Sequence, residues 1–198
     1  MKIDRDLFSK LCQKYPTPLR VQKFLQSIPY NSEEDGETVR SAYAALEANK
    51  IHCLEASFLA AAILEHAHYP PMVMSLESQD GLDHVLFLYK EKSGWGSVAR
   101  SRDAGLEGRR PVFKSLKALA ASYIDPYVDG TGRVTGYGIA SFHEVQADWK
   151  FSKRNLWSVE NYLIELPHKK INCSESRYQK LLKRFELGLA PLRRPHWL

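Results

Sequence analysis

Cysteine is scarce in this chain of 198 residues, which contains only Cys12, Cys53 and Cys173. An odd and widely spaced set of this kind excludes a disulfide framework and a zinc site built from clustered cysteines, and it is typical of a reducing compartment. Long apolar runs are absent as well. The longest uninterrupted run covers residues 58–64, far fewer than the roughly 20 that a membrane-spanning helix needs. We therefore expect a cytoplasmic protein without membrane insertion.

The bulk composition fits a soluble globular domain. Hydrophobic residues make up 44% and charged residues 26% of the chain, which is ordinary for such a protein. The first residues, MKIDRDLFSK, include acids and no apolar core, so we expect no secretory signal peptide. The length predicts a single domain over residues 1–198, with a helical N-terminal part (1–50), a catalytic-like core (51–113) and a helical C-terminal part with a basic tail (114–198).

The formal net charge of +5 is unevenly distributed. Residues 168–198 contain eight Lys or Arg and two Glu, so that segment carries +6 and residues 1–167 carry −1. A basic helical face is usually only solvated. The alternative is a weak contact with an acidic partner, nucleic acid or a membrane surface, and no nucleic-acid motif supports it.

Apolar periodicity predicts an α+β fold. Helical spacing or strong helix formers occupy 4–15, 19–28, 38–50, the stretch from Cys53 to the prolines of HYPP, 114–128, 156–166 and 174–187. Short apolar or alternating runs predict strands at 72–77, 84–90 and 96–101. The glycine-rich segment 131–146 reads as a flexible loop over the cleft, with room for one short strand. Trp149, Trp157 and Tyr162 are predicted to be core aromatics.

The position of Cys53 raises the question of function. It opens a nearly all-apolar stretch in which only Glu55 and Ser57 are polar between Leu54 and Leu64. One interpretation is that Cys53 fills core space as a small hydrophobe. The other is that it is a nucleophile at a helix N-terminus, where the backbone dipole favours a thiolate.

A thiol nucleophile needs a base within hydrogen-bond reach and a third group that orients the base. His84, inside an apolar strand, is the best base available. The third group depends on the hairpin that follows. If Ser93–Gly94 is a two-residue turn, His84 faces Asp103 across the strands; if the loop spans 91–94, His84 faces Ser101. Both alternatives stay open, although a carboxylate serves the chemistry better.

These residues resemble the transglutaminase-like superfamily, rearranged relatives of papain. The segments that carry the resemblance are HCLEASFLAAAIL, HVLFLY, WGSVARSRD and RRPVF, and the small bacterial branch with the lasso-peptide leader peptidases is the most similar. The resemblance covers about residues 50 to 113. In the family the aspartate comes about four residues after a tryptophan on the strand. Here the residue four positions after Trp95 is Ala99, and Ser101 and Asp103 lie further along the chain.

The resemblance implies a papain-like fold in which a central cysteine-bearing helix packs on a small antiparallel sheet with flanking helices. It implies Cys53 as nucleophile and His84 as base, in an amidase, peptidase or acyl transferase that forms a thioester on a peptide or other amide substrate without metal or organic cofactor. A catalytically silent domain that acts as a binding module is the alternative. The Cys53 amide would stabilise the oxyanion with a second donor, for which Asn49 and Tyr43 are candidates.

Overall fold

The computed structural model describes residues 5–81 and 83–189 and has an α+β fold built around one six-stranded sheet. The strands follow the order β4-β3-β2-β1-β5-β6, and every neighbouring pair is antiparallel. The strands are β1 (Met72–Ser78), β2 (His84–Glu91), β3 (Gly94–Val98), β4 (Arg109–Phe113), β5 (Val134–Ser141) and β6 (Lys169–Lys170). The helices are α1 (Arg5–Lys14), α2 (Pro18–Ser27), α3 (Ala42–Ala48), α4 (Cys53–His66), α5 (Leu116–Ala121), α6 (Ile124–Tyr127), α7 (Trp157–Ile164) and α8 (Glu175–Glu186).

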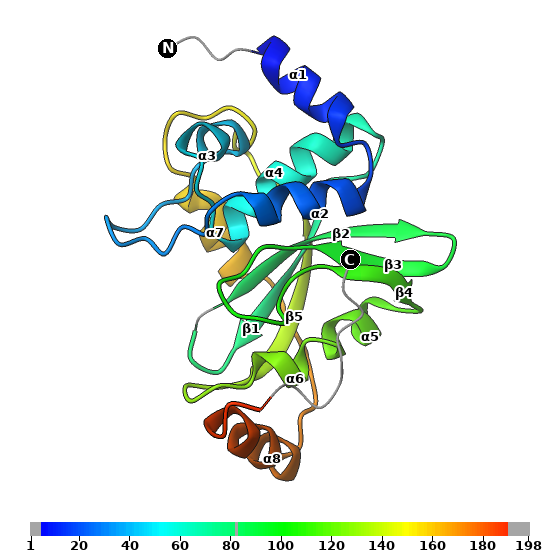
Figure 1. The fold of residues 1–198 in the computed structure, drawn as a ribbon, viewed down its shortest axis with the longest axis vertical. Coiled ribbons are helices and arrows are strands. Elements are labelled where there is room, and N and C mark those ends of the chain that lie inside the picture. The colour runs from blue at the N-terminus through cyan, green and yellow to red at the C-terminus, as the bar shows by residue number, and fades with distance from the viewer. Residues whose placement is uncertain (1–4, 82, 190–198) are drawn as a thin grey trace.

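The sheet separates two layers of helices (Figure 1). Helices α1 to α4 and α7 lie on one side of it, and α5, α6 and α8 lie on the other. Because side chains alternate across a strand, β2 sends Phe87 to the first layer and Leu86 and Leu88 to the second. Burial on both faces explains why β2 is a continuous apolar run rather than an alternating one.

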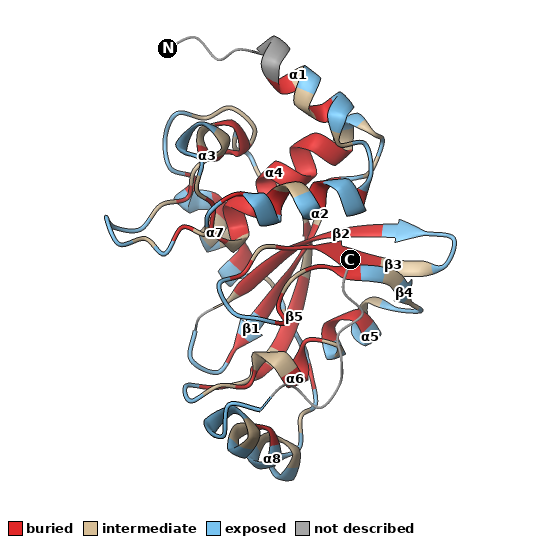
Figure 2. Ribbon diagram, in the orientation of Figure 1, coloured by how far each residue is buried: buried red, intermediate tan, exposed pale blue. Residues whose placement is uncertain are grey.

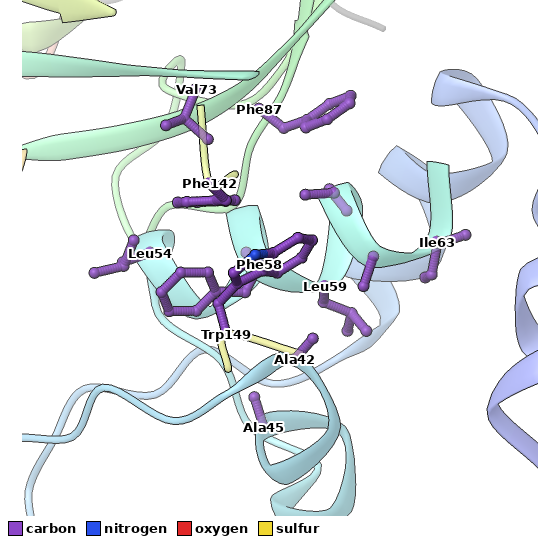
Figure 3. Packing of buried hydrophobic residues seen from close by; sticks show 14 of the residues in the cluster. Ala42, Ala45, Leu54, Phe58, Leu59, Ile63, Val73, Phe87, Phe142 and Trp149 are labelled. Carbon is purple, nitrogen blue, oxygen red and sulfur yellow. The ribbon is translucent and has the colours of Figure 1, made fainter. Parts of the chain in front are cut away.

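Helix α4 is the most deeply buried helix of the fold, as Figure 2 shows. Every residue from Leu54 to Leu64 is buried, because α4 lies between the other helices and the sheet. Phe58 of α4 packs on Phe142 and Trp149, with ring centroids 4.8 and 6.5 Å away (Figure 3). This core fixes the axis of the helix that begins at Cys53.

Two segments differ from the sequence prediction. The segment 131–146, predicted as a loop with room for one short strand, contains the eight-residue strand β5, which pairs with β1. Its glycines serve packing: a Cβ at Gly138 would lie 3.2 Å from Leu166 Cβ and 3.1 Å from His168 Nε2.

The helix predicted over 38–50 begins only at Ala42. Backbone groups before it bond elsewhere: the Val39 amide donates to Asn155 Oδ1 at 3.1 Å and the Arg40 amide to Glu55 Oε1 at 3.0 Å. The extended segment 38–41 therefore runs past the start of α4 and becomes part of the site. No helix among residues 5–81 and 83–189 is both long and apolar enough to span a bilayer.

Candidate active site

Cys53 is the first residue of α4, and His52 caps the helix. The His52 ring accepts the Leu54 amide at Nδ1 (3.3 Å), and the Glu55 carboxylate accepts the His52 amide (3.2 Å). This reciprocal cap satisfies amides that have no partner inside the helix. The amides that open the helix also place the positive end of its dipole beside the Cys53 sulfur.

The two polar residues of the apolar stretch hold this helix end in place. Glu55 is fully buried and pairs with Arg40, whose Nε lies 2.7 Å from Oε1 and whose Nη2 lies 3.0 Å from Oε2. Ser57 Oγ donates towards the carbonyls of Cys53 (3.0 Å) and Val85 (3.1 Å). Glu55 thus ties α4 to the extended segment 38–41, and Ser57 ties it to β2 next to His84.

The structure brings His84 to Cys53. The His84 imidazole is close enough to the Cys53 sulfur to lower its pKa, and His84 is buried at the start of β2. The Cys53 thiol itself lies 3.9 Å from the Asp83 carbonyl oxygen. Nε2 of His84 donates to the Leu106 carbonyl at 2.8 Å, because a carbonyl only accepts. Nδ1 is therefore the ring nitrogen left for the sulfur. The Tyr123 ring packs edge-on against the imidazole, with centroids 6.2 Å apart.

The surroundings of Cys53 favour its thiolate. Burial alone would raise its pKa, but hydrogen bonds from His52 and His84 and the charge of both rings outweigh burial and lower the pKa to about 5. By contrast, burial raises the pKa of both Cys12 and Cys173. Cys53 is thus the one cysteine of the three that the structure prepares for ionisation.

His52, next to Cys53 in the chain, also interacts with the sulfur, although the sequence pointed to His84 as the base. Burial disfavours its charged form, but the hydrogen bond to Cys53, the Cys53 charge and the Glu55 carboxylate raise its pKa to about 9. Its Nε2 donates to the Thr38 carbonyl at 2.7 Å. Nδ1 accepts from Leu54 only when the ring is neutral and donates to sulfur only when protonated, so these two roles exclude each other.

The expected partners of His84, Asp103 and Ser101, line the same cleft but do not bond to its Nε2. In the β2–β3 hairpin Glu91 pairs with Gly94 and Lys90 with Trp95, so the Ser93–Gly94 turn and the Asp103 register are wrong. The observed register is the one that would direct His84 towards Ser101, but β3 ends at Val98 before that position.

Gly94 explains the register. A Cβ at this residue would lie 2.5 Å from the Phe113 carbonyl oxygen, and its φ is +150°. The glycine is therefore needed inside β3, where β4 approaches closely, and it is not part of the turn.

Asp103 and Ser101 bond to neighbours in the loop after β3. Asp103 pairs with Arg102 Nε at 3.3 Å and has a side chain that is 56% exposed. Ser101 Oγ accepts the Asp103 amide at 3.0 Å. In the part of the chain that the structure describes, neither side chain is the partner of His84 Nε2, and Leu106 replaces both.

The predicted oxyanion donors also lie elsewhere. Tyr43 is buried against Phe8 and Phe151, and Asn49 ends α3 in the left-handed conformation. Tyr30 is on the cleft wall instead, and the Cys53 thiolate and burial together raise its pKa, so its hydroxyl keeps its proton. It follows α2 in an irregular segment, and the sequence holds no signal that singles it out.

Cys53 opens into a cleft of about 980 Å³. The walls come from both helical layers and from the loops at the start of β2. The residues that line this cleft include Tyr30, His52, His84, Leu106, Trp157 and Glu160. Trp157 was predicted as core and is 39% exposed, so that prediction is wrong, whereas Trp149 is buried as predicted.

The basic C-terminal helix α8 is attached to the body beside this cleft. Arg177 forms an ion pair with the buried Asp125, and Arg133 pairs with Glu175 at 3.0 Å. Leu181 and Phe185 of α8 line the cleft. Part of the basic character of α8 therefore serves intramolecular pairing.

Comparison with known proteins gives a distant fold likeness only. No family model matches the chain, and no curated protein matches it. Solved chains do match; one of them is LapG from Legionella pneumophila in an EGTA-treated form, with a TM-score of 0.38 and 8% identity over 85% of this chain and 77% of that one. A likeness of this degree identifies neither a family nor an activity.

Proposed function

We propose that the protein is a cysteine enzyme of the transglutaminase-like, papain-like type that transfers or hydrolyses an acyl group through a thioester on Cys53. The observation that carries the proposal is Cys53 at the first position of α4, on the wall of a large cleft that His84 also lines. A thiolate beside an imidazole at a helix N-terminus is the arrangement that makes cysteine nucleophilic.

Each site residue has its own role in the proposed reaction. The Cys53 thiolate attacks the substrate carbonyl carbon, and the oxyanion that forms meets the Cys53 amide at the helix start and the Tyr30 hydroxyl. The protonated His84 gives its Nδ1 proton to the leaving amine. Water or an acceptor amine then attacks the thioester. Nδ1 of His84 accepts a proton from that nucleophile, and the Cys53 thiolate is released.

Leu106 and His52 have separate tasks in a site where, among the described residues, no carboxylate contacts His84. The Leu106 carbonyl fixes the tautomer and orientation of His84 but adds no full charge. His52, next to Glu33 and Glu55 at 3.9 and 3.6 Å, supplies positive charge to the thiolate. We therefore assign general base and acid to His84 and stabilisation of the thiolate to His52.

The test uses p-nitrophenyl acetate as acyl donor. The wild-type protein should release nitrophenolate in a burst and carry an acetyl group on the Cys53 peptide, detected by mass spectrometry. Cys53→Ser should lose the burst, and Cys173→Ser, the matched control, should keep it. Acetylation spread evenly over the three cysteines would mean that the cleft is a binding site and not a catalytic one.

A further inference from the structure

The cleft has a charge opposite to that of the whole chain. The protein carries a formal +5, yet among the described residues the cleft wall holds eight carboxylates against two arginines, Arg102 and Arg184. The carboxylates are Glu33, Glu37, Asp80, Asp83, Asp103, Asp125, Asp129 and Glu160. A low-dielectric cleft lined by one sign of charge concentrates ligands of the other sign.

Not all of these acids are available to a ligand. Asp103 and Asp125 are paired with arginines. Glu160, on α7, is half-buried, and its carboxylate has neither a hydrogen bond nor an ion pair with the residues described. Burial raises its pKa, the neighbouring charges of Glu37 and Glu33 raise it further, and His52 lowers it. A half-buried carboxylate that has other carboxylates nearby and no bonded cation gains from a bound positive charge.

Trp157 lies one helical turn before Glu160 on the same helix. Residues three apart on a helix share a face, and both line the cleft. Trp157 keeps 39% of its surface exposed. An indole face beside a free carboxylate is suited to a cationic side chain, whose charge interacts with the ring and with the acid.

We infer that the cleft selects a peptide substrate by a Lys or Arg side chain that binds between Trp157 and Glu160, with Glu33 and Glu37 adding to the negative field. Glu160 and Trp157 line the same cleft as Cys53, so a side chain held between them would bring its own peptide backbone into the cleft that contains the nucleophile. The inference rests on the proposed function, since it names the substrate class for that site.

The first experiment measures the charge preference of Cys53 directly. Two methanethiosulfonates of similar size, one with a trimethylammonium and one with a sulfonate group, are reacted with the full chain in EDTA-containing buffer at low salt. Labelling at Cys53 and at Cys173 is followed by mass spectrometry. Both reagents attack the thiolate, so their rate ratio does not depend on how much thiolate is present.

We expect the cation-to-anion ratio to be roughly tenfold or more higher at Cys53 than at Cys173, and to fall when salt screens the field. Glu160→Gln should reduce the ratio about threefold. Glu165→Gln removes a charge from an exposed residue just after α7 that does not line the cleft, and it should leave the ratio unchanged. Equal ratios at Cys53 and Cys173 would overturn the inference. A Cys53 ratio that does not fall with added salt would also overturn it, and this measurement needs no variant.

The second experiment tests the side-chain site itself. Nα-acetyl-lysine methylamide should slow labelling of Cys53 by iodoacetamide at lower concentration than the norleucine amide of the same shape, and Trp157→Leu or Glu160→Gln should remove the difference. A cation preference without selective protection by lysine would overturn the pocket. Slow labelling of Cys53 at pH 6 by every reagent would instead contradict the nucleophile, so the inference and the proposed function fail separately.

Discussion

The two histidines beside Cys53 belong to regions that hold them by different means. On the strand side, His84 is fixed by the Leu106 backbone carbonyl at 2.8 Å. On the helix side, His52 is fixed by the Thr38 carbonyl at 2.7 Å and lies close to the carboxylates of Glu33 and Glu55. A carbonyl orients a ring, whereas a carboxylate also stabilises its positive charge. His84 is therefore oriented without a carboxylate, whereas the ring whose positive charge is stabilised by carboxylates is His52.

His84→Gln should have the largest effect on chemistry, because it removes the group that moves the proton. We expect acetylation of Cys53 by p-nitrophenyl acetate to fall by roughly 10²–10⁴-fold. His66→Gln, a change in the last turn of α4, is the matched control and should react like wild type. Unchanged acetylation of the His84 variant would assign proton transfer to the helix side.

Glu55→Ala should have the largest effect on folding. It leaves Arg40 and the His52 amide without their partner at a site that is fully buried. Breaking such a pair costs about 3–5 kcal/mol, which urea unfolding measures. Glu47→Ala, at an exposed position of α3, should change the free energy of unfolding by less than about 0.5 kcal/mol. Equal losses would mean that the helix side is not held through Glu55.

His52→Gln should change the pH dependence of Cys53 rather than its maximal reactivity. Glutamine can accept the Leu54 amide as the neutral histidine does, so the helix start stays capped, but the positive charge that the protonated ring places beside the sulfur is lost and the pKa of Cys53 rises. We expect the iodoacetamide rate at pH 6 to fall by roughly tenfold or more, with little change at pH 9. A rate that falls equally at both pH values would point to a disturbed helix end instead.

Asp103→Asn should have the smallest effect. The exposed carboxylate pairs with Arg102 and not with His84, so acetylation of Cys53 should stay within about twofold of wild type, as expected for a surface pair. A large loss would restore Asp103 as the third member of the site in the acylating state, and would make Leu106 a partner of the resting state only.

The sequence predicted the parts of the site that local pattern encodes. Cys53 at a helix start, the helix end at HYPP and the strand that begins at His84 follow from apolar spacing and proline, and the α+β fold follows from their order. The residues Glu55 and Ser57 also stood out as polar groups in an apolar stretch, and the structure shows that they connect α4 to its neighbours.

What the sequence could not give depended on tertiary contacts. The partner of His84 is a backbone carbonyl, and every residue type carries one, so no side chain signals Leu106. Gly94 is needed where the Phe113 backbone of β4 packs against it, and not in the hairpin turn. Because β4 lies beyond the hairpin in the chain, the turn sequence alone did not indicate this. The glycines of β5 resembled a loop because their packing partners, Leu166 and His168, come from a later segment.

The most direct test of the account is the pH dependence of alkylation at each cysteine. Iodoacetamide labelling, resolved by residue and followed from pH 4 to pH 10, should show Cys53 half-maximal near pH 5 and constant above about pH 6. Cys12 and Cys173, whose pKa values are raised by burial, should label only in the alkaline range. A Cys53 profile that rises together with theirs would contradict the claim that two imidazoles and a helix start hold this sulfur as a thiolate.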